Sequence, residues 1–255
     1  MKIRAIILSA LILCGISAVI MYSRAAQPLQ KSSVITQAIN DKNTPMVIKN
    51  LILKMKEQME VNDDQFPELI KEVENYTNSC ADSASVAVLH SMLAEMYQNY
   101  FQRNQWTINQ RTQLSGYIPE DIRVWTSNLF TDKIKEEIDL SLRPTALLQN
   151  TPVSKFKDIL EIGKDSQTLR PTLYEFLAFR ALDIQPTVQI YKDLIAFQNK
   201  EPNMKSVLLT ELDYLRFLYG DKRDKESFEA YMNALDELYL SLIHISEPTR
   251  PISIS

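Results

Sequence analysis

The stretch that decides the fold, residues 86–100, reads VAVLHSMLAEMYQNY. Its large apolar residues recur every three or four positions, which is the period of an α-helix that buries one side. They are Val86, Leu89, Leu93, Met96, Tyr97 and Tyr100. The stretch therefore predicts an amphipathic helix whose apolar stripe faces a core.

The same period continues on both sides of this helix. Toward the N-terminus it marks helices at residues 46–60 and 66–76, the first opened by Thr44 as an N-cap. Toward the C-terminus it marks a helix over residues 129–142 and a shorter one around Phe156. No stretch alternates as a strand does, and 4 glycines are too few for the tight turns of a β-sandwich or barrel. The predicted fold class is all-α.

From Pro171 onward the predicted helices become evenly spaced. They cover residues 173–181, 188–195, 208–219 and 228–235, with short turns between them. Antiparallel helices of this kind are typical of α-solenoids of the tetratricopeptide type, although no strict 34-residue repeat can be aligned. The sequence predicts an array of antiparallel helix pairs, with a tetratricopeptide-like α-solenoid in the second half. We expect an N-terminal helical region over residues 26–165 and a helix-pair repeat region over residues 166–239.

The N-terminus is predicted to direct export. It begins Met-Lys-Ile-Arg, continues with an apolar run from Ala5 to Tyr22 and reaches small residues at Ser23 and Ala25. This pattern makes residues 1–25 a signal peptide. Two alternatives stay open, an uncleaved membrane anchor and a lipoprotein signal with Cys14 as the modified residue. All three place the body of the protein in the periplasm or cell envelope, with the membrane contacted only through this segment.

The C-terminal run LSLIHISEPTR, residues 240–250, resembles a laboratory sequence. The transposase adaptor of sequencing libraries encodes this run when it is translated in frame. We therefore expect residues 240–255 to be an adaptor-derived artefact and the natural protein to continue past residue 239. We also expect the preceding apolar stripe, which includes Phe228, Met232 and Tyr239, to be left partly uncovered. His244 then has no part in the chemistry.

Charge and cysteine content exclude several classes of protein. The chain carries 28 Lys and Arg against 32 Asp and Glu, and the two ends hold four of the bases and one of the acids, so residues 26–239 have a net charge of −7. An acidic body without a cluster of bases argues against nucleic acid as the partner. Two cysteines and two histidines cannot supply a Cys₄ or Cys₂His₂ zinc site. Cys80 lacks a basic neighbour in sequence and is expected to be a spectator.

Few side chains suit catalysis. The carboxylate pairs Glu72 with Glu74 and Glu136 with Glu137 stand beside lysines and are expected on solvated helix faces. His90 flanks the apolar stripe, and we expect a buried, hydrogen-bonded helix residue rather than a general base. A group of aromatic residues is expected to be core rather than the lining of a groove: Tyr97, Tyr100, Phe101, Trp106 and Trp125. We predict no catalytic, cofactor-binding or metal-binding residue and no enzyme activity.

Blocks of sequence in a fixed order resemble a known family. They are HSMLAEMY (90–97), YFQRNQW (100–106), RT (111–112), DIRVW (121–125), FKDIL (156–160), LRPTLYEFLA (169–178) and RALD (180–183). The order resembles the N-terminal region of large bacterial α2-macroglobulin-like proteins of the variety found in Bacteroidetes. The resemblance covers residues 45–239 and departs from the family at Ile184-Gln185-Pro186.

The resemblance implies a role without assigning residues to it. Family members look like secreted or envelope-attached protease traps, so it implies endopeptidase inhibition by the full-length parent, with proteases as partners of domains downstream of this chain. The family's Cys-x-Glu-Gln thioester motif is not present, since Cys80 is followed by Ala81-Asp82-Ser83. We expect a non-catalytic helical N-terminal fragment of such a protein. The alternative is a stand-alone envelope helical-repeat module whose concave face holds a protein or peptide. A third class is an all-helical periplasmic hydrolase, for which this sequence offers few suitable catalytic residues.

Overall fold

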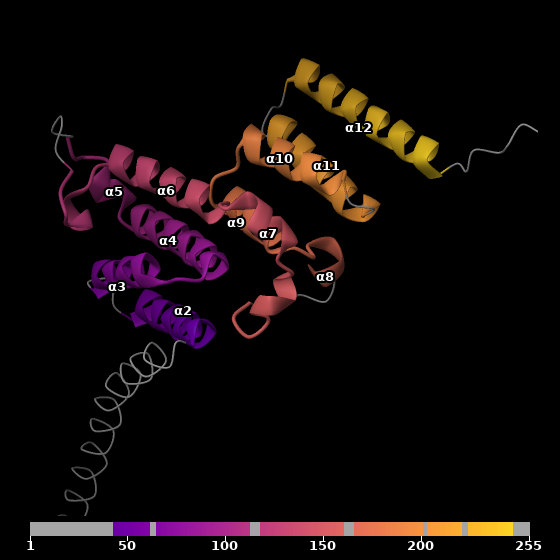
Figure 1. Ribbon diagram of the computed structural model, residues 1–255. Coiled ribbons are helices and arrows are strands. Elements are labelled where there is room, and N and C mark those ends of the chain that lie inside the picture. The colour runs from indigo at the N-terminus through magenta and orange to yellow at the C-terminus, as the bar shows by residue number, and fades with distance from the viewer. Residues whose placement is uncertain are drawn as a thin grey trace, which may run out of the picture. The chain divides into compact units, whose positions relative to one another are not determined.

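The computed structural model describes residues 43–61, 65–112, 118–160, 166–200, 203–220 and 224–246. The expected signal peptide and residues 247–255 of the expected artefact lie outside these ranges. Over the described residues the chain is all-α, as predicted: helices pack as adjacent pairs and no strand forms (Figure 1). None of the helices in these ranges is both long enough and apolar enough to cross a membrane.

The described helices vary in length from a single turn to more than twenty residues. In chain order they are α2 (Thr44–Val61), α3 (Phe66–Ser79), α4 (Ser83–Arg103), α5 (Gln105–Ile108), α6 (Ser127–Ser141), α7 (Thr145–Asn150), α8 (Ser166–Leu169), α9 (Leu173–Ile184), α10 (Val188–Gln198), α11 (Met204–Tyr219) and α12 (Lys225–Ser246), with 3₁₀ turns η2 (Ile122–Val124) and η3 (Val153–Phe156).

The chain separates into two compact units. Within the described residues the first holds 43–141 together with 156–160, and the second holds 142–155 together with 166–246. The division at residue 165 that the sequence suggests stays a prediction.

The first unit is built around α4, which packs against α6, α3 and α2 (Figure 1). The predicted stripe faces this core: Leu89, Leu93, Met96, Tyr97 and Tyr100 are buried, and Val86 is half-buried. Asp82 fixes the start of α4, because its carboxylate accepts hydrogen bonds from the backbone N–H of Ser85 at 3.2 Å and from the Ser85 hydroxyl at 2.6 Å. Periodicity and cap together place this helix.

Two local expectations for the first unit and its border were wrong. The cap of α2 is Asn43 and not Thr44, since the Asn43 side chain accepts the N–H of Met46 at 3.2 Å. The short helix expected around Phe156 is a 3₁₀ turn, although the Phe156 side chain is buried.

In the second unit, two backbone hydrogen bonds hold the loop at residues 151–153 against the start of the helical array. The N–H of Val153 donates to the carbonyl of Pro171 at 2.9 Å, and the N–H of Leu173 donates to the carbonyl of Thr151 at 2.8 Å. These bonds close an isolated bridge between Pro152 and Thr172. From there α9, α10, α11 and α12 follow, each packed against the next.

Burial falls along this array. Leu177 in α9 and Leu194 in α10 are fully buried. The stripe predicted for α11 through Leu212 and Leu215 is half-buried. On α12, Phe228 and Met232 are exposed, as is Tyr239, which agrees with the expectation of an uncovered stripe. The helix itself continues from Lys225 to Ser246 without a break at residue 240.

The N-terminus of α9 yields the first prediction. The Thr172 hydroxyl accepts the N–H of Glu175 at 3.2 Å, and the Glu175 carboxylate accepts the N–H of Thr172 at 3.1 Å, a reciprocal capping box. Thr172→Ala should lower the stability of α9 by about 1 kcal/mol, because the backbone N–H of Glu175 loses its acceptor. Thr172→Ser keeps the hydroxyl and should lower the stability of α9 by only a few tenths of a kcal/mol. Hydrogen exchange of the α9 amides measures both, and equal protection in Thr172→Ala and the wild type would contradict the prediction.

Candidate functional site

The carboxylate expected on a solvated face, Glu137, is instead buried inside the first unit. Its side chain is 3% exposed, and it accepts from His90 Nδ1 at 2.7 Å and from Lys133 Nζ at 2.8 Å. Burial by itself raises the pKa of Glu137, but the hydrogen bonds and positive charges of His90 and Lys133 outweigh it and hold the pKa below its ordinary value. The exposed member of the pair, Glu136, forms an ion pair with Lys133 at 2.9 Å.

This cluster connects α4 to α6. His90 has the hydrogen bond that the sequence led us to expect, and its partner lies 47 residues away. Both oxygens of Glu137 are occupied by groups of the protein itself. A buried carboxylate held at both oxygens positions two helices, and it leaves no oxygen turned to a substrate.

One member of the second carboxylate pair, Glu74, also contacts the core. Glu74 accepts the hydroxyl of Tyr97 at 2.6 Å, which brings α3 and α4 together. Burial raises the pKa of the Tyr97 hydroxyl, and the adjacent Glu74 carboxylate raises it further, so this phenol stays protonated. Glu72 forms an ion pair with Lys54 of α2. The expectation of a solvated face was therefore wrong for Glu74 as it was for Glu137.

Three of the five aromatic residues are buried, Phe101 is half-buried and Trp106 is exposed. Tyr97, Tyr100 and Trp125 are buried, and the ring of Phe130 lies 5.3–6.5 Å from those of Tyr97, Tyr100, Phe101 and Trp125. Trp125 also donates its indole N–H to the carbonyl of Pro119 at 2.7 Å. Trp106, expected in the core, is 79% exposed on the single turn of α5.

Two further expectations about chemistry concern metals and thiols. Within the described ranges, no group of three or more His, Cys, Asp or Glu side chains is placed to hold a metal ion. Cys80 is half-buried, with its Sγ 4.0 Å from the carbonyl of Asp82.

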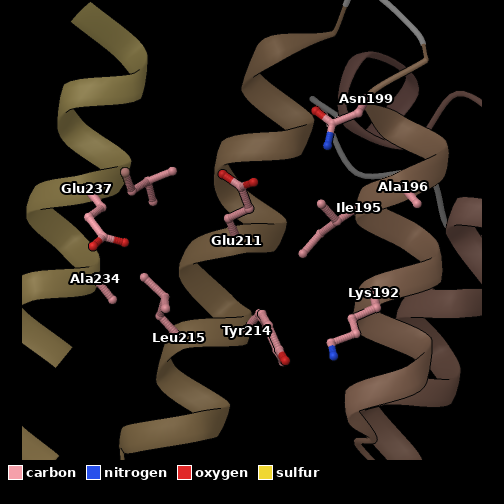
Figure 2. A pocket seen from close by; sticks show the side chains of 10 residues that line it. Lys192, Ile195, Ala196, Asn199, Glu211, Tyr214, Leu215, Ala234 and Glu237 are labelled. Atoms are coloured by element: carbon pink, nitrogen blue, oxygen red, sulfur yellow. The ribbon is translucent and has the colours of Figure 1, made fainter. Parts of the chain in front are cut away.

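A groove on the second unit is the best candidate for a functional site. It runs across α10, α11 and α12 and encloses a volume of about 550 Å³. Each helix contributes residues spaced i, i+3 and i+4, which places them on one face. The lining residues are Lys192, Ile195, Ala196 and Asn199 from α10, Glu211, Tyr214 and Leu215 from α11, and Ala234, Glu237 and Leu238 from α12 (Figure 2).

Apolar and charged groups are mixed in this groove. Ile195, Leu215 and Ala234 are half-buried, and Figure 2 shows the Glu211 side chain on the middle helix, between the residues of its two neighbours. Burial raises the pKa of the Glu211 carboxyl above its ordinary value. The carboxylate thus sits in a partly desolvated place on the floor of a groove.

A second groove, on the first unit, differs in its charges. It lies between α2 and α3, encloses about 560 Å³ and includes the carboxylates of Glu68 and Glu72. Both have partners, since Glu68 pairs with Arg123 and Glu72 pairs with Lys54. Both carboxylates of this groove therefore have a countercharge within the protein, whereas Glu211 has none among the described residues.

The groove across α10, α11 and α12 has a counterpart in the sequence, a mixed polar and apolar helix face. Periodicity alone does not distinguish such a face from an ordinary solvated one. The core of α10 uses Ile190, Tyr191, Leu194 and Phe197, while the groove uses the adjacent face through Lys192 and Asn199. Solvated helices also have a mixed face beside an apolar stripe. Three such faces therefore form a site only when the fold aligns them.

Comparisons with protein-family models, with curated proteins and with solved structures find no match to this chain.

Proposed function

We propose that this chain is a non-catalytic helical binding protein whose second unit holds a peptide or a protein segment in the groove across α10, α11 and α12. The observation that carries the proposal is the groove itself, since the same face of three consecutive helices lines a volume of about 550 Å³ with both apolar and charged side chains. Apolar walls supply affinity and a few polar groups fix the orientation of what binds.

The array of α9 to α12 supports a finer proposal, a tetratricopeptide-like α-solenoid in this unit. Consecutive helices pack against each other and are joined by connections of a few residues, at 185–187, 199–203 and 220–224. Arrays of this kind present extended surfaces to peptides and to other proteins.

The first unit supports a role without catalysis. Two of its buried or half-buried side chains that could act as acid or base are engaged within the protein, since His90 is bonded to Glu137 and Tyr97 is bonded to Glu74. Such pairs stabilise helix contacts, and a catalytic carboxyl needs an oxygen or a proton free for the substrate.

The sequence blocks carry a second proposal, that this helical chain is the N-terminal region of an exported α2-macroglobulin-like protein. Endopeptidase inhibition then belongs to the parent protein and acts through domains downstream of residue 239. The undamaged gene tests this directly: reading on past codon 239 should reveal β-rich macroglobulin domains, and a stop codon there would leave the stand-alone binding module.

Export forms a separate prediction. A fusion of residues 1–40 to a reporter that is active only after crossing the inner membrane should be active, because a basic start precedes the apolar run from Ala5 to Tyr22. Replacing three central leucine or isoleucine residues of that run by aspartate should abolish the activity. A reporter that stays in the cytoplasm with the unaltered segment would refute the proposal of export.

Binding in the groove is tested with a blocked variant. Ala234→Arg places a large side chain inside the groove, whereas Asn233→Arg adds the same group to the exposed adjacent position on α12. The full chain is panned against a displayed library of 12-residue peptides, and the selected clones are tested on both variants. We expect Ala234→Arg to abolish binding and Asn233→Arg to retain it. Equal binding to both would show that peptides do not use this groove.

A further inference from the structure

Among the described acids of the second unit, Glu211 is the one that is half-buried and has no partner. Asp213 pairs with Arg216 at 3.2 Å, Glu229 pairs with Lys225 at 3.6 Å, and Glu175 is held by Thr172 and Gln198. Within the part of the chain that the structure describes, no ion pair or hydrogen bond joins Glu211 to another group, although its residue is half-buried. A partly desolvated carboxylate without a countercharge is costly, and a cation beside it removes that cost.

The walls around Glu211 suit a cation with a long apolar stem. Ile195 lies on the α10 side, Leu215 follows Glu211 one turn along α11, and Ala234 lies on the α12 side (Figure 2). Leu238 of α12 belongs to the same lining. Lysine and arginine bury their methylene stems along apolar surface while the charged end reaches a polar partner. Glu237 adds a second carboxylate to the same lining.

Lys192 is the one basic residue among the described residues that line the groove, and it determines where along the groove a bound cation would lie. Lys192 stands on α10 next to Tyr214 of α11, at one end of the groove (Figure 2). A cation bound there would meet a like charge, so electrostatic complementarity places the cation of a ligand at Glu211 and not beside Lys192.

We propose that the groove binds a peptide segment through one lysine or arginine side chain, with Glu211 as its ionic partner and Ile195 and Leu215 against its stem. This inference rests on the proposed function of the groove. It adds the chemistry of the partner, a segment of a protein with a basic residue flanked by aliphatic ones.

The test uses the full chain and the displayed library of 12-residue peptides as the probe. Deep sequencing compares the clones selected by the wild type with those selected by Glu211→Gln. The wild type should enrich lysine or arginine several-fold at one position, and Glu211→Gln should lose that enrichment while it keeps the aliphatic residues. The best clone, synthesised with a fluorescein label, should bind Glu211→Gln about tenfold more weakly by fluorescence anisotropy.

Two controls separate the ion pair from general effects. Glu229→Gln removes a carboxylate of α12 that does not line the groove, and its affinity for the labelled peptide should equal that of the wild type. A peptide with norleucine or citrulline in place of the basic residue should bind the wild type and Glu211→Gln equally. Circular dichroism should show unchanged helix content in every variant.

The outcomes distinguish this inference from the proposed function. Peptides that bind, are blocked by Ala234→Arg and show no basic preference would overturn the inference and leave the groove as a binding site. Binding that no groove variant alters would overturn both. Sedimentation showing concentration-dependent self-association that Ala234→Arg abolishes would identify a second copy of this chain as the occupant and also overturn the inference.

Discussion

Phe130→Ala should lower the free energy of unfolding of the first unit by about 4 kcal/mol, the range expected for truncating a fully buried aromatic side chain. Phe130 is 0% exposed, and its ring contacts those of Tyr97, Tyr100 and Trp125. Its removal leaves a cavity between α4 and α6, and rigidly packed neighbours fill such a cavity only in part.

Tryptophan fluorescence during urea unfolding measures this effect in the first unit alone. The chain has 2 tryptophans, Trp106 and Trp125, and both lie in that unit. Trp106→Ala is the matched control, since it truncates a larger aromatic side chain that is exposed, and it should change stability by less than about 0.5 kcal/mol. Phe130→Leu should lose only about 1 kcal/mol. A similar loss in Phe130→Ala and Trp106→Ala would contradict the packing described here.

Glu137→Ala should lower the stability of the same unit by about 3 kcal/mol, because it leaves His90 and Lys133 without their shared partner in a buried place. The lower end of the range for buried pairs applies, since the side chains of His90 and Lys133 are 16% and 24% exposed. Glu136→Ala removes the neighbouring carboxylate, which is 58% exposed, and should change stability by less than about 0.5 kcal/mol.

The same cluster predicts a pH dependence of stability. The pKa of Glu137 is lower in the folded chain than its ordinary value of 4.5, so its contribution is fully present above that value. The contribution is lost as the pH falls through the folded-state pKa, where the carboxylate becomes protonated. As the pH falls below about 4.5, the wild type should therefore lose stability more steeply than Glu137→Ala. Parallel curves over this range would show that Glu137 titrates normally and that the cluster contributes little.

The sequence predicted the helices well and their surroundings less well. The stripe from Leu89 to Tyr100 identified α4 because a period of 3.6 residues is a local property that tertiary contacts seldom override. The carboxylate of Glu137 was misjudged because its partner, His90, lies 47 residues earlier, and charge patterns within α6 alone resemble those of a solvated face. Trp106 was misjudged because composition favours burial of a large ring, while a single helical turn leaves it on the surface.

The groove was beyond sequence reasoning for a different reason. Glu211, Lys192 and Glu237 belong to three helices, and nothing in the residues of one helix says which face of the next will lie beside it. Sequence gave the spacing within each helix, whereas the alignment of the three faces depends on side-chain volumes between the helices. The lack of a countercharge for Glu211 is a property of that alignment.

The path of the chain and the bridge between Pro152 and Thr172 have a consequence for dividing the protein into fragments. Because residues 142–155 belong to the second unit and residues 156–160 belong to the first, the polypeptide passes from one unit to the other more than once. A single cut, by a protease or by a truncated gene, cannot release either unit intact. A fragment that begins at residue 166 lacks α7 and the loop whose carbonyl at Thr151 binds the N–H of Leu173. Circular permutation, with new ends in the connection between α10 and α11, would keep that loop attached to α9.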